Sequence, residues 1–179
     1  MNTPDKALHV RPVRVDDYVE ILRINSEASP HVAQLDGCEL DRLVALARVA
    51  WVADGPTGVC GYLLAMSNTD DYDGEEFCRF RQRLTEPFMY VDQIAIDCEA
   101  RRTSVASQMY ERLMRWSHEH SRFVLCCEVN VQPPNSASMK FHERLGFESL
   151  GEMRTCDGRL VALLCKHVPQ SNKTMEPTR

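Results

Sequence analysis

Four residues at positions 101–104, Arg-Arg-Thr-Ser, have the types and spacing of an anion-binding loop. They follow an apolar run at 88–97 that predicts a strand, and they lead into an amphipathic run at 104–120 that predicts a helix. The first N–H groups of a helix lack partners within it, and the helix dipole makes that end positive. The loop is therefore predicted to bind an anionic group such as a phosphate. Solvated arginines in an ordinary strand-to-helix connection would show the same pattern.

A second stretch, at 135–147, combines helix signals with polar side chains. Two prolines precede Asn135 and prevent an earlier start, and the asparagine side chain is suited to cap a helix over 136–145. Gly146 fits the position just past the end of such a helix, because glycine adopts the left-handed conformation without strain. The stretch therefore predicts a short helix with defined ends, directly after an apolar strand at 123–129.

A sheet must bring these two stretches together. Apolar periodicity, turn residues and caps predict seven strands and four helices in the order β-α-α-β-β-β-α-β-α-β-β. A hairpin beside βα units implies an α/β fold with a mixed sheet and helices on both faces. The strands are expected at 8–15, 49–53, 59–66, 88–97, 123–129, 147–153 and 160–168, and the helices at 16–24, 39–48, 104–120 and 136–145.

The elements fit a single domain over residues 8–168. The polar tail at 169–179 contains no core residues and is predicted to be disordered. The segment at 67–87 is charged, acidic first and basic after, and has no clear period of its own. It is expected to be a solvated insertion or a lid over a substrate, and a short helix at 75–84 is compatible with it.

The two stretches and the element order resemble the GCN5-related N-acetyltransferase (GNAT) superfamily over roughly residues 8–168. The pyrophosphate loop of that family reads Gln/Arg-x-x-Gly-x-Gly/Ala, and Arg101, Ser104 and Ala106 fill its three defined positions. A later family motif, Asn-x-x-Ala/Ser-x-x-Phe/Leu-Tyr/His-x-x-x-Gly-Phe, matches residues 135–147. Each motif alone is a weak signal, but both motifs in this order are a strong one.

The resemblance implies that the central strands at 88–97 and 123–129 splay apart and that acetyl-CoA lies between them. The loop N–H groups would hold the pyrophosphate, and the central strand would pair with the pantetheine arm as an added strand. Ser104 replaces the usual glycine, so weakened or reshaped binding is expected there. The residues implied in acetyl-CoA binding are Ile94, Ala95, Ile96, Arg101, Arg102, Thr103, Ser104, Val105, Ala106, Ser107, Asn135, Ser138 and Phe141.

Acetyl transfer to an amine needs a base for the ammonium, a donor to the oxyanion and an acid for the thiolate. The resemblance places the oxyanion donor at a backbone N–H near Ile94. His142 stands where many members have a tyrosine acid, and it either donates the proton or only packs near acetyl-CoA. Glu128, in an apolar strand, and Asp92, on the central strand, are the candidate bases, although either carboxylate could simply face solvent.

Composition limits the partners that the protein is expected to have. A net charge of −5 argues against nucleic acid, and no apolar run approaches the ~20 residues of a membrane span. The N-terminal sequence lacks a signal pattern, so a cytoplasmic location is expected. The eight cysteines form no Cys-x-x-Cys pair, which favours free thiols and no metal site, with Cys98 as the one candidate nucleophile.

The sequence therefore predicts an acetyl-CoA-dependent N-acetyltransferase that transfers the acetyl group directly to a primary amine in a ternary complex. The amine belongs to a small molecule, a peptide or a protein, and the sequence does not identify it. The alternative is a noncatalytic acyl-CoA-binding regulatory domain of the same fold, for which Ser104 and the missing tyrosine would be suited. Both a monomer and a homodimer stay open.

Overall fold

Apolar alternation and turn residues build a seven-stranded sheet in this chain, and the computed structural model describes it over residues 8–168. The predicted disorder of 169–179 lies outside the described residues. The strands are β1 His9–Pro12, β2 Val49–Gly55, β3 Gly58–Ser67, β4 Phe88–Ile96, β5 Val124–Gln132, β6 Glu148–Arg154 and β7 Leu160–His167. The helices are α1 Tyr18–Ala28, α2 Gly37–Leu46, α3 Glu75–Arg83, α4 Val105–Glu119 and α5 Ser136–Arg144, with 3-10 turns at Val15–Asp17 and Cys98–Ala100.

The predicted α/β fold with a mixed sheet is confirmed. The strand order is β1-β2-β3-β4-β5-β7-β6, and the pairing is antiparallel except between β4 and β5. The helix α3 forms within the charged segment at 67–87, where the sequence was compatible with a short helix but did not predict one. The helix α2 begins two residues earlier than predicted, because Asp36 accepts a hydrogen bond from the Glu39 N–H at 2.8 Å and caps it.

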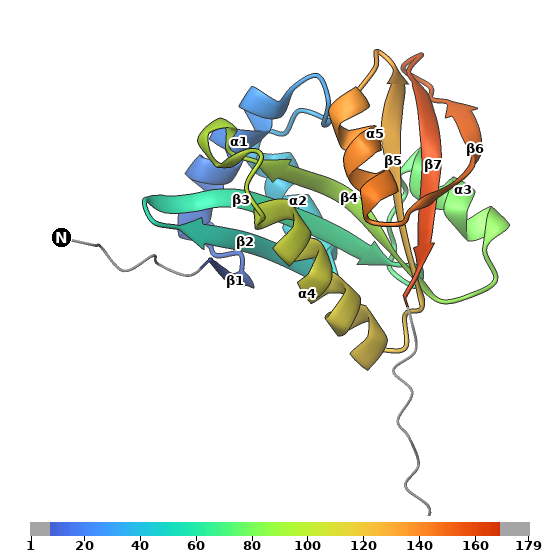
Figure 1. Ribbon diagram of the computed structural model, residues 1–179, viewed down its shortest axis with the longest axis horizontal. Helices are drawn as coiled ribbons and strands as arrows, with labels where there is room; N and C mark the ends of the chain where they lie inside the picture. The colour runs from blue at the N-terminus through green and yellow to red at the C-terminus, as the bar shows by residue number, and fades with distance from the viewer. Residues whose placement is uncertain (1–7, 169–179) are drawn as a thin grey trace, which may run out of the picture.

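The helices cover both faces of the sheet (Figure 1). The helix α4 packs one face with Met109, Tyr110 and Leu113, all fully buried. On the opposite face, α1, α2 and α3 bury a separate cluster that includes Ile24 and Phe80. Each helix contributes an apolar stripe at helical spacing, so the sheet is enclosed and only its edges and strand ends reach solvent.

The central strands β4 and β5 pair over a short length only. Parallel pairing joins Phe88–Tyr90 of β4 to Val124–Cys126 of β5, and no pairing follows beyond these residues. A register shift on the other edge of β4 leaves Asp92 as the extra residue of a bulge, because Val91 pairs with Ala65 and Gln93 pairs with Leu64. A bulge bends its strand, so the two central strands diverge where the predicted site residues begin.

The described residues contain no helix that is long and apolar enough to cross a membrane. Between residues 8 and 168, no group of three or more His, Cys, Asp or Glu side chains is arranged to hold a metal ion. All eight cysteines lie in this range as free thiols, with Cys126, Cys127 and Cys165 buried in the sheet as expected of small apolar side chains.

Candidate active site

A cleft of about 840 Å³ runs along the outer half of β4, between the loop after β4 and the helix α5. One wall carries Ile94 and Ile96, and the opposite wall carries Asn135 and Phe141. The structure thus brings the two sequence motifs to the two sides of one opening. Of the predicted acetyl-CoA residues, those that line the cleft are Ile94, Ala95, Ile96, Arg101, Arg102, Thr103, Ala106, Ser107, Asn135, Ser138 and Phe141.

The loop at 101–104 forms one end of the cleft and turns the chain into α4. Within the described residues, no hydrogen bond reaches the N–H groups of these four positions, which leaves them open to an anion. Arg102 has a positive φ of 63°, a conformation that costs a non-glycine residue energy. The loop therefore bends at Arg102, and the Arg102 side chain is exposed beside the cleft.

Ser104, the departure from the family motif, does not itself line this cleft. Its φ of −82° is open to any residue, so the local backbone does not require glycine. Its hydroxyl accepts a hydrogen bond from Gln108 Nε2 at 2.7 Å, and Ser104 and Val105 instead line a neighbouring hollow. Cys98 is exposed in the same hollow and lies away from the cleft.

A strut from α1 fixes the start of the loop. Arg23 donates to the Asp97 carboxylate across the two elements, and it also contacts Glu20 and Glu27 on its own helix at 2.9 and 2.7 Å. Asp97 in turn accepts from the Glu99 N–H at 2.8 Å and caps the 3-10 turn that leads into the loop. The position of the loop therefore depends on a helix that is distant in sequence.

An inner pocket of about 200 Å³ lies between the diverging strands and opens toward the opposite side of the sheet. Ile94, Asn135, Ser138 and His142 line both this pocket and the cleft. Two volumes with a common wall at the splay can each hold one substrate, and the groups to be joined would meet at that wall.

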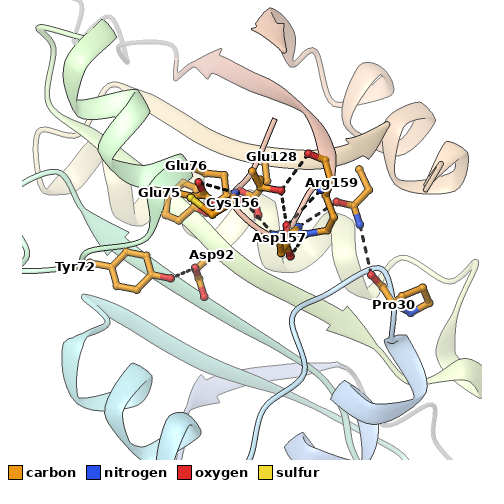
Figure 2. Close-up of polar contacts among 12 residues, drawn as sticks. Pro30, Tyr72, Glu75, Glu76, Asp92, Glu128, Cys156, Asp157 and Arg159 are labelled. Carbon is orange, nitrogen blue, oxygen red and sulfur yellow. Dashed lines mark hydrogen bonds and ion pairs between the residues drawn. The ribbon is translucent and has the colours of Figure 1, made fainter. Parts of the chain in front are cut away.

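The two candidate bases lie on facing strands and both line the inner pocket. Tyr90 donates a hydrogen bond to Glu128 Oε2 at 2.7 Å. Tyr72 donates to Asp92 Oδ1 at 2.5 Å, as Figure 2 shows. Burial, with the nearby charges of Glu76 and Asp92, raises the pKa of Glu128 to about 8. Burial also raises the pKa of Asp92, to about 6, although the hydrogen bond from Tyr72 opposes the shift.

The rim of the inner pocket is tied together by polar contacts (Figure 2). Arg159, after the turn between β6 and β7, donates to Asp157 at 2.8 Å and to Asn130 at 3.2 Å, and lies 3.4 Å from Glu76 of α3. The adjacent Glu75 accepts from the Cys156 N–H at 2.8 Å. The helix α3, the end of β5 and the β6–β7 turn are thereby fastened around the pocket.

His142 is buried, with 3% of its surface exposed, and both ring nitrogens have partners. Its Nδ1 lies 2.9 Å from the Ser138 carbonyl oxygen, which can only accept, so Nδ1 carries the proton. In the neutral ring Nε2 then accepts from the Tyr110 hydroxyl at 2.8 Å. Burial lowers the pKa of His142, which keeps this neutral tautomer at pH 7.

The sequence predicted the site residues on the strands, but it did not predict the side chains that contact them. Tyr72 and Arg159 reach the inner pocket from elements far from the two motifs, and Tyr110 reaches it from α4, which begins within the first motif. The acidic run that contains Glu76 was a signal of charge near the acceptor, but nothing in it singled out that glutamate. No sequence period marks which side of α4 would present Tyr110 to His142.

Comparisons with known proteins agree with this geometry. Residues 11–147 match the Acetyltransferase (GNAT) family. NAA60 from Arabidopsis thaliana in complex with a bisubstrate analogue has a similar structure, with a TM-score of 0.74, 13% identity and coverage of 92% of this chain and 100% of that one. The same protein in complex with acetyl-CoA gives a TM-score of 0.71, 12% identity and coverage of 90% and 100%.

Ard1 from Thermoplasma volcanium is also similar, with a TM-score of 0.71, 16% identity and coverage of 91% of this chain and 99% of that one. At such identities a shared structure shows the fold alone. Among curated protein sequences, none matches this chain significantly. The family match spans more than half of the sequence, and the chain therefore belongs to the GNAT family and is an acetyltransferase.

Proposed function

We propose that the protein transfers an acetyl group from acetyl-CoA directly to a primary amine while both substrates are bound. The observation that carries this proposal is the meeting of the cleft and the inner pocket at Ile94, Asn135 and His142. Separate volumes let the two substrates bind together, so no acetylated enzyme is needed. The one cysteine at the inner pocket, Cys127, is buried with a raised pKa, which disfavours a thiolate nucleophile.

The cleft is suited to the donor. The open N–H groups at 101–104 and the N-terminus of α4 would hold the pyrophosphate, and the two exposed arginines of that loop would add charge. The unpaired edge of β4 at Ile94 and Ile96 offers backbone groups to the pantetheine arm, with Asn135, Ser138 and Phe141 along the other wall. Acetyl-CoA supplies an activated thioester, and the chain supplies its orientation.

The proton of the acceptor ammonium is assigned to Glu128. The ammonium first loses one proton to the Glu128 carboxylate, and the neutral amine then attacks the thioester carbon. As the carbon–sulfur bond breaks and the amide forms, the nitrogen loses a second proton, which leaves to solvent. A base with a pKa near the working pH removes the first proton efficiently, and the pKa of about 8 places Glu128 in that range. Asp92, with a pKa of about 6, is mostly ionised at pH 7 and would attract the cation and serve as the alternative base.

The departing thiolate takes its proton from the pair formed by Tyr110 and His142, of which His142 lines both volumes and Tyr110 lines the inner pocket. Neutral His142 donates through Nδ1 to Ser138, so Tyr110 carries the other exchangeable proton of the pair. His142 thus orients the Tyr110 hydroxyl and shares its proton. Solvent restores the pair between turnovers.

A turnover screen tests the function. Wild-type protein, Glu128→Gln and His142→Phe are incubated with acetyl-CoA and a panel of small amines, amino acids and peptides, and release of the free thiol is followed. Acetylation of one acceptor class by the wild type is expected, with rates about 10²-fold lower in each variant. Acetyl-CoA binding with no transfer to any amine would contradict the proposal and favour a binding domain. Unchanged rates in both variants would contradict the catalytic assignments alone.

A further inference from the structure

The carboxyl groups that line the inner pocket outnumber the cationic side chains that line it. Asp92 and Glu128 line it near the splay, and Glu76, 8% exposed, lines it from α3. The nearest cation to Glu76 is Arg159, whose guanidinium lies 3.4 Å away and is already shared with Asp157 at 2.8 Å. Burial raises the pKa of Glu76, as it raises those of the other two carboxyl groups, and a cation that enters the pocket would favour their ionised forms.

One part of the pocket lining is apolar, within a lining that is otherwise polar. Leu35, Leu43 and Val129 form this part together with the rings of Tyr72 and Tyr90. A volume of about 200 Å³ can hold a short alkyl chain along this apolar part, with polar ends at the carboxyl groups. An acceptor with a carboxylate would place like charge beside Glu76, which the low-dielectric surroundings would penalise.

We propose that Glu76 binds a second cationic group of the acceptor, so that the preferred substrate is a short linear diamine. This inference rests on the proposed acetyl transfer and names its substrate class. One ammonium lies between Asp92 and Glu128, where it loses its proton and meets the thioester. The alkyl chain lies along the apolar part of the lining, and the second ammonium completes the ion pairing of Glu76 that Arg159 provides only in part.

Matched acceptors test the proposal with the protein as it is. Putrescine, n-pentylamine and γ-aminobutyrate are compared by kcat/KM with saturating acetyl-CoA. The pentylamine replaces the distal ammonium by a methyl group of similar size, and the aminobutyrate replaces it by a carboxylate. Putrescine is expected to exceed n-pentylamine by about tenfold and γ-aminobutyrate by more. The advantage over n-pentylamine is expected to shrink as salt is added, because screening weakens the second ion pair.

Variants then place the effect at one residue. Glu76→Gln should bring the putrescine-to-pentylamine ratio close to one while leaving acetyl-CoA affinity unchanged, since Glu76 does not line the cleft. Asp71→Asn, which removes the same charge from an exposed position on the same segment, should leave the ratio at its wild-type value. Acetyl-CoA affinity also reports whether each variant is folded.

The outcomes separate this inference from the function beneath it. Equal rates for putrescine and n-pentylamine in the wild type, a ratio that Glu76→Gln does not change, or a preference for peptide N-termini would overturn the diamine assignment and leave acetyl transfer to amines standing. Failure to acetylate any amine in the wider panel would overturn the proposed function and this inference together.

Discussion

At the scale of single residues, the proposed proton transfer depends on Glu128, a carboxyl group that its surroundings hold protonated below about pH 8. The pKa of Glu128 lies near 8 in the fold, well above the ordinary value of 4.5. In the unfolded chain this carboxyl group loses its proton near the ordinary pKa of 4.5, whereas in the fold it keeps the proton up to about pH 8. The native state therefore loses stability as pH rises from about 5 to 8. The proposed base therefore lowers the stability of the native state at the pH where it would act.

The corresponding prediction concerns the free energy of unfolding. Glu128→Gln keeps the side-chain shape without an ionisable group, and it should be more stable than wild type by about 1–3 kcal/mol near pH 8 and nearly equal near pH 4. Urea denaturation across this pH range measures the difference. Glu143→Gln, at an exposed position of α5, should follow the wild-type curve. Parallel curves for wild type and Glu128→Gln would show that the carboxyl group is not perturbed.

Some residues of the site had a conformation that local sequence rules predicted, and others did not. The cap of α5 by Asn135, which accepts from the Ser138 N–H at 3.1 Å, and the positive φ of 81° at Gly146 were both predicted from local rules. The effect expected from Ser104 depended on a conformation that a sequence does not display. The residue of the loop in the left-handed conformation is Arg102, whereas Ser104 has a negative φ that any residue can adopt.

At the scale of elements, the position of the donor loop depends on the contact between α1 and the end of β4. Arg23→Met removes the cation that holds Asp97 and keeps most of the apolar stem of the side chain. The affinity for acetyl-CoA should fall about fivefold, while kcat changes little. Titration calorimetry with acetyl-CoA measures the change, and Arg115→Met, at an exposed site of α4, is the control. Equal affinities in Arg23→Met and wild type would show that the strut does not position the loop.

Elements with a clear period or cap were predictable, whereas contacts between elements were not. The strand β4 and the helix α4 follow from apolar spacing in their own residues. The pairing of Tyr72 with Asp92 and of Tyr110 with His142 depends on the bulge in β4 and on the rotation of α4 about its axis. Neither quantity is encoded by a local pattern, and the segment that holds Tyr72 has no period at all.

At the scale of the whole molecule, the sheet order creates the site. Placing β4 beside β5 in parallel, with antiparallel neighbours on either side, leaves one pair of strands free to diverge inside an otherwise continuous sheet (Figure 1). The loop after β4 and the helix after β5 then face each other across that gap. The resemblance to the GNAT superfamily predicted the location of the opening, while the charge of the inner pocket emerged only from the folded arrangement.

The pH dependence of kcat/KM shows most directly whether Glu128, at the point where β4 and β5 diverge, is the general base. Wild type, Glu128→Gln and Asp92→Asn are compared with an alkyl amine whose own pKa is about 10, far from the limb of interest. The wild-type rate should rise through a limb near pH 8, Asp92→Asn should keep that limb, and Glu128→Gln should lose it with a rate about 10²-fold lower. A Glu128→Gln variant that keeps both the wild-type rate and the wild-type limb would contradict the account.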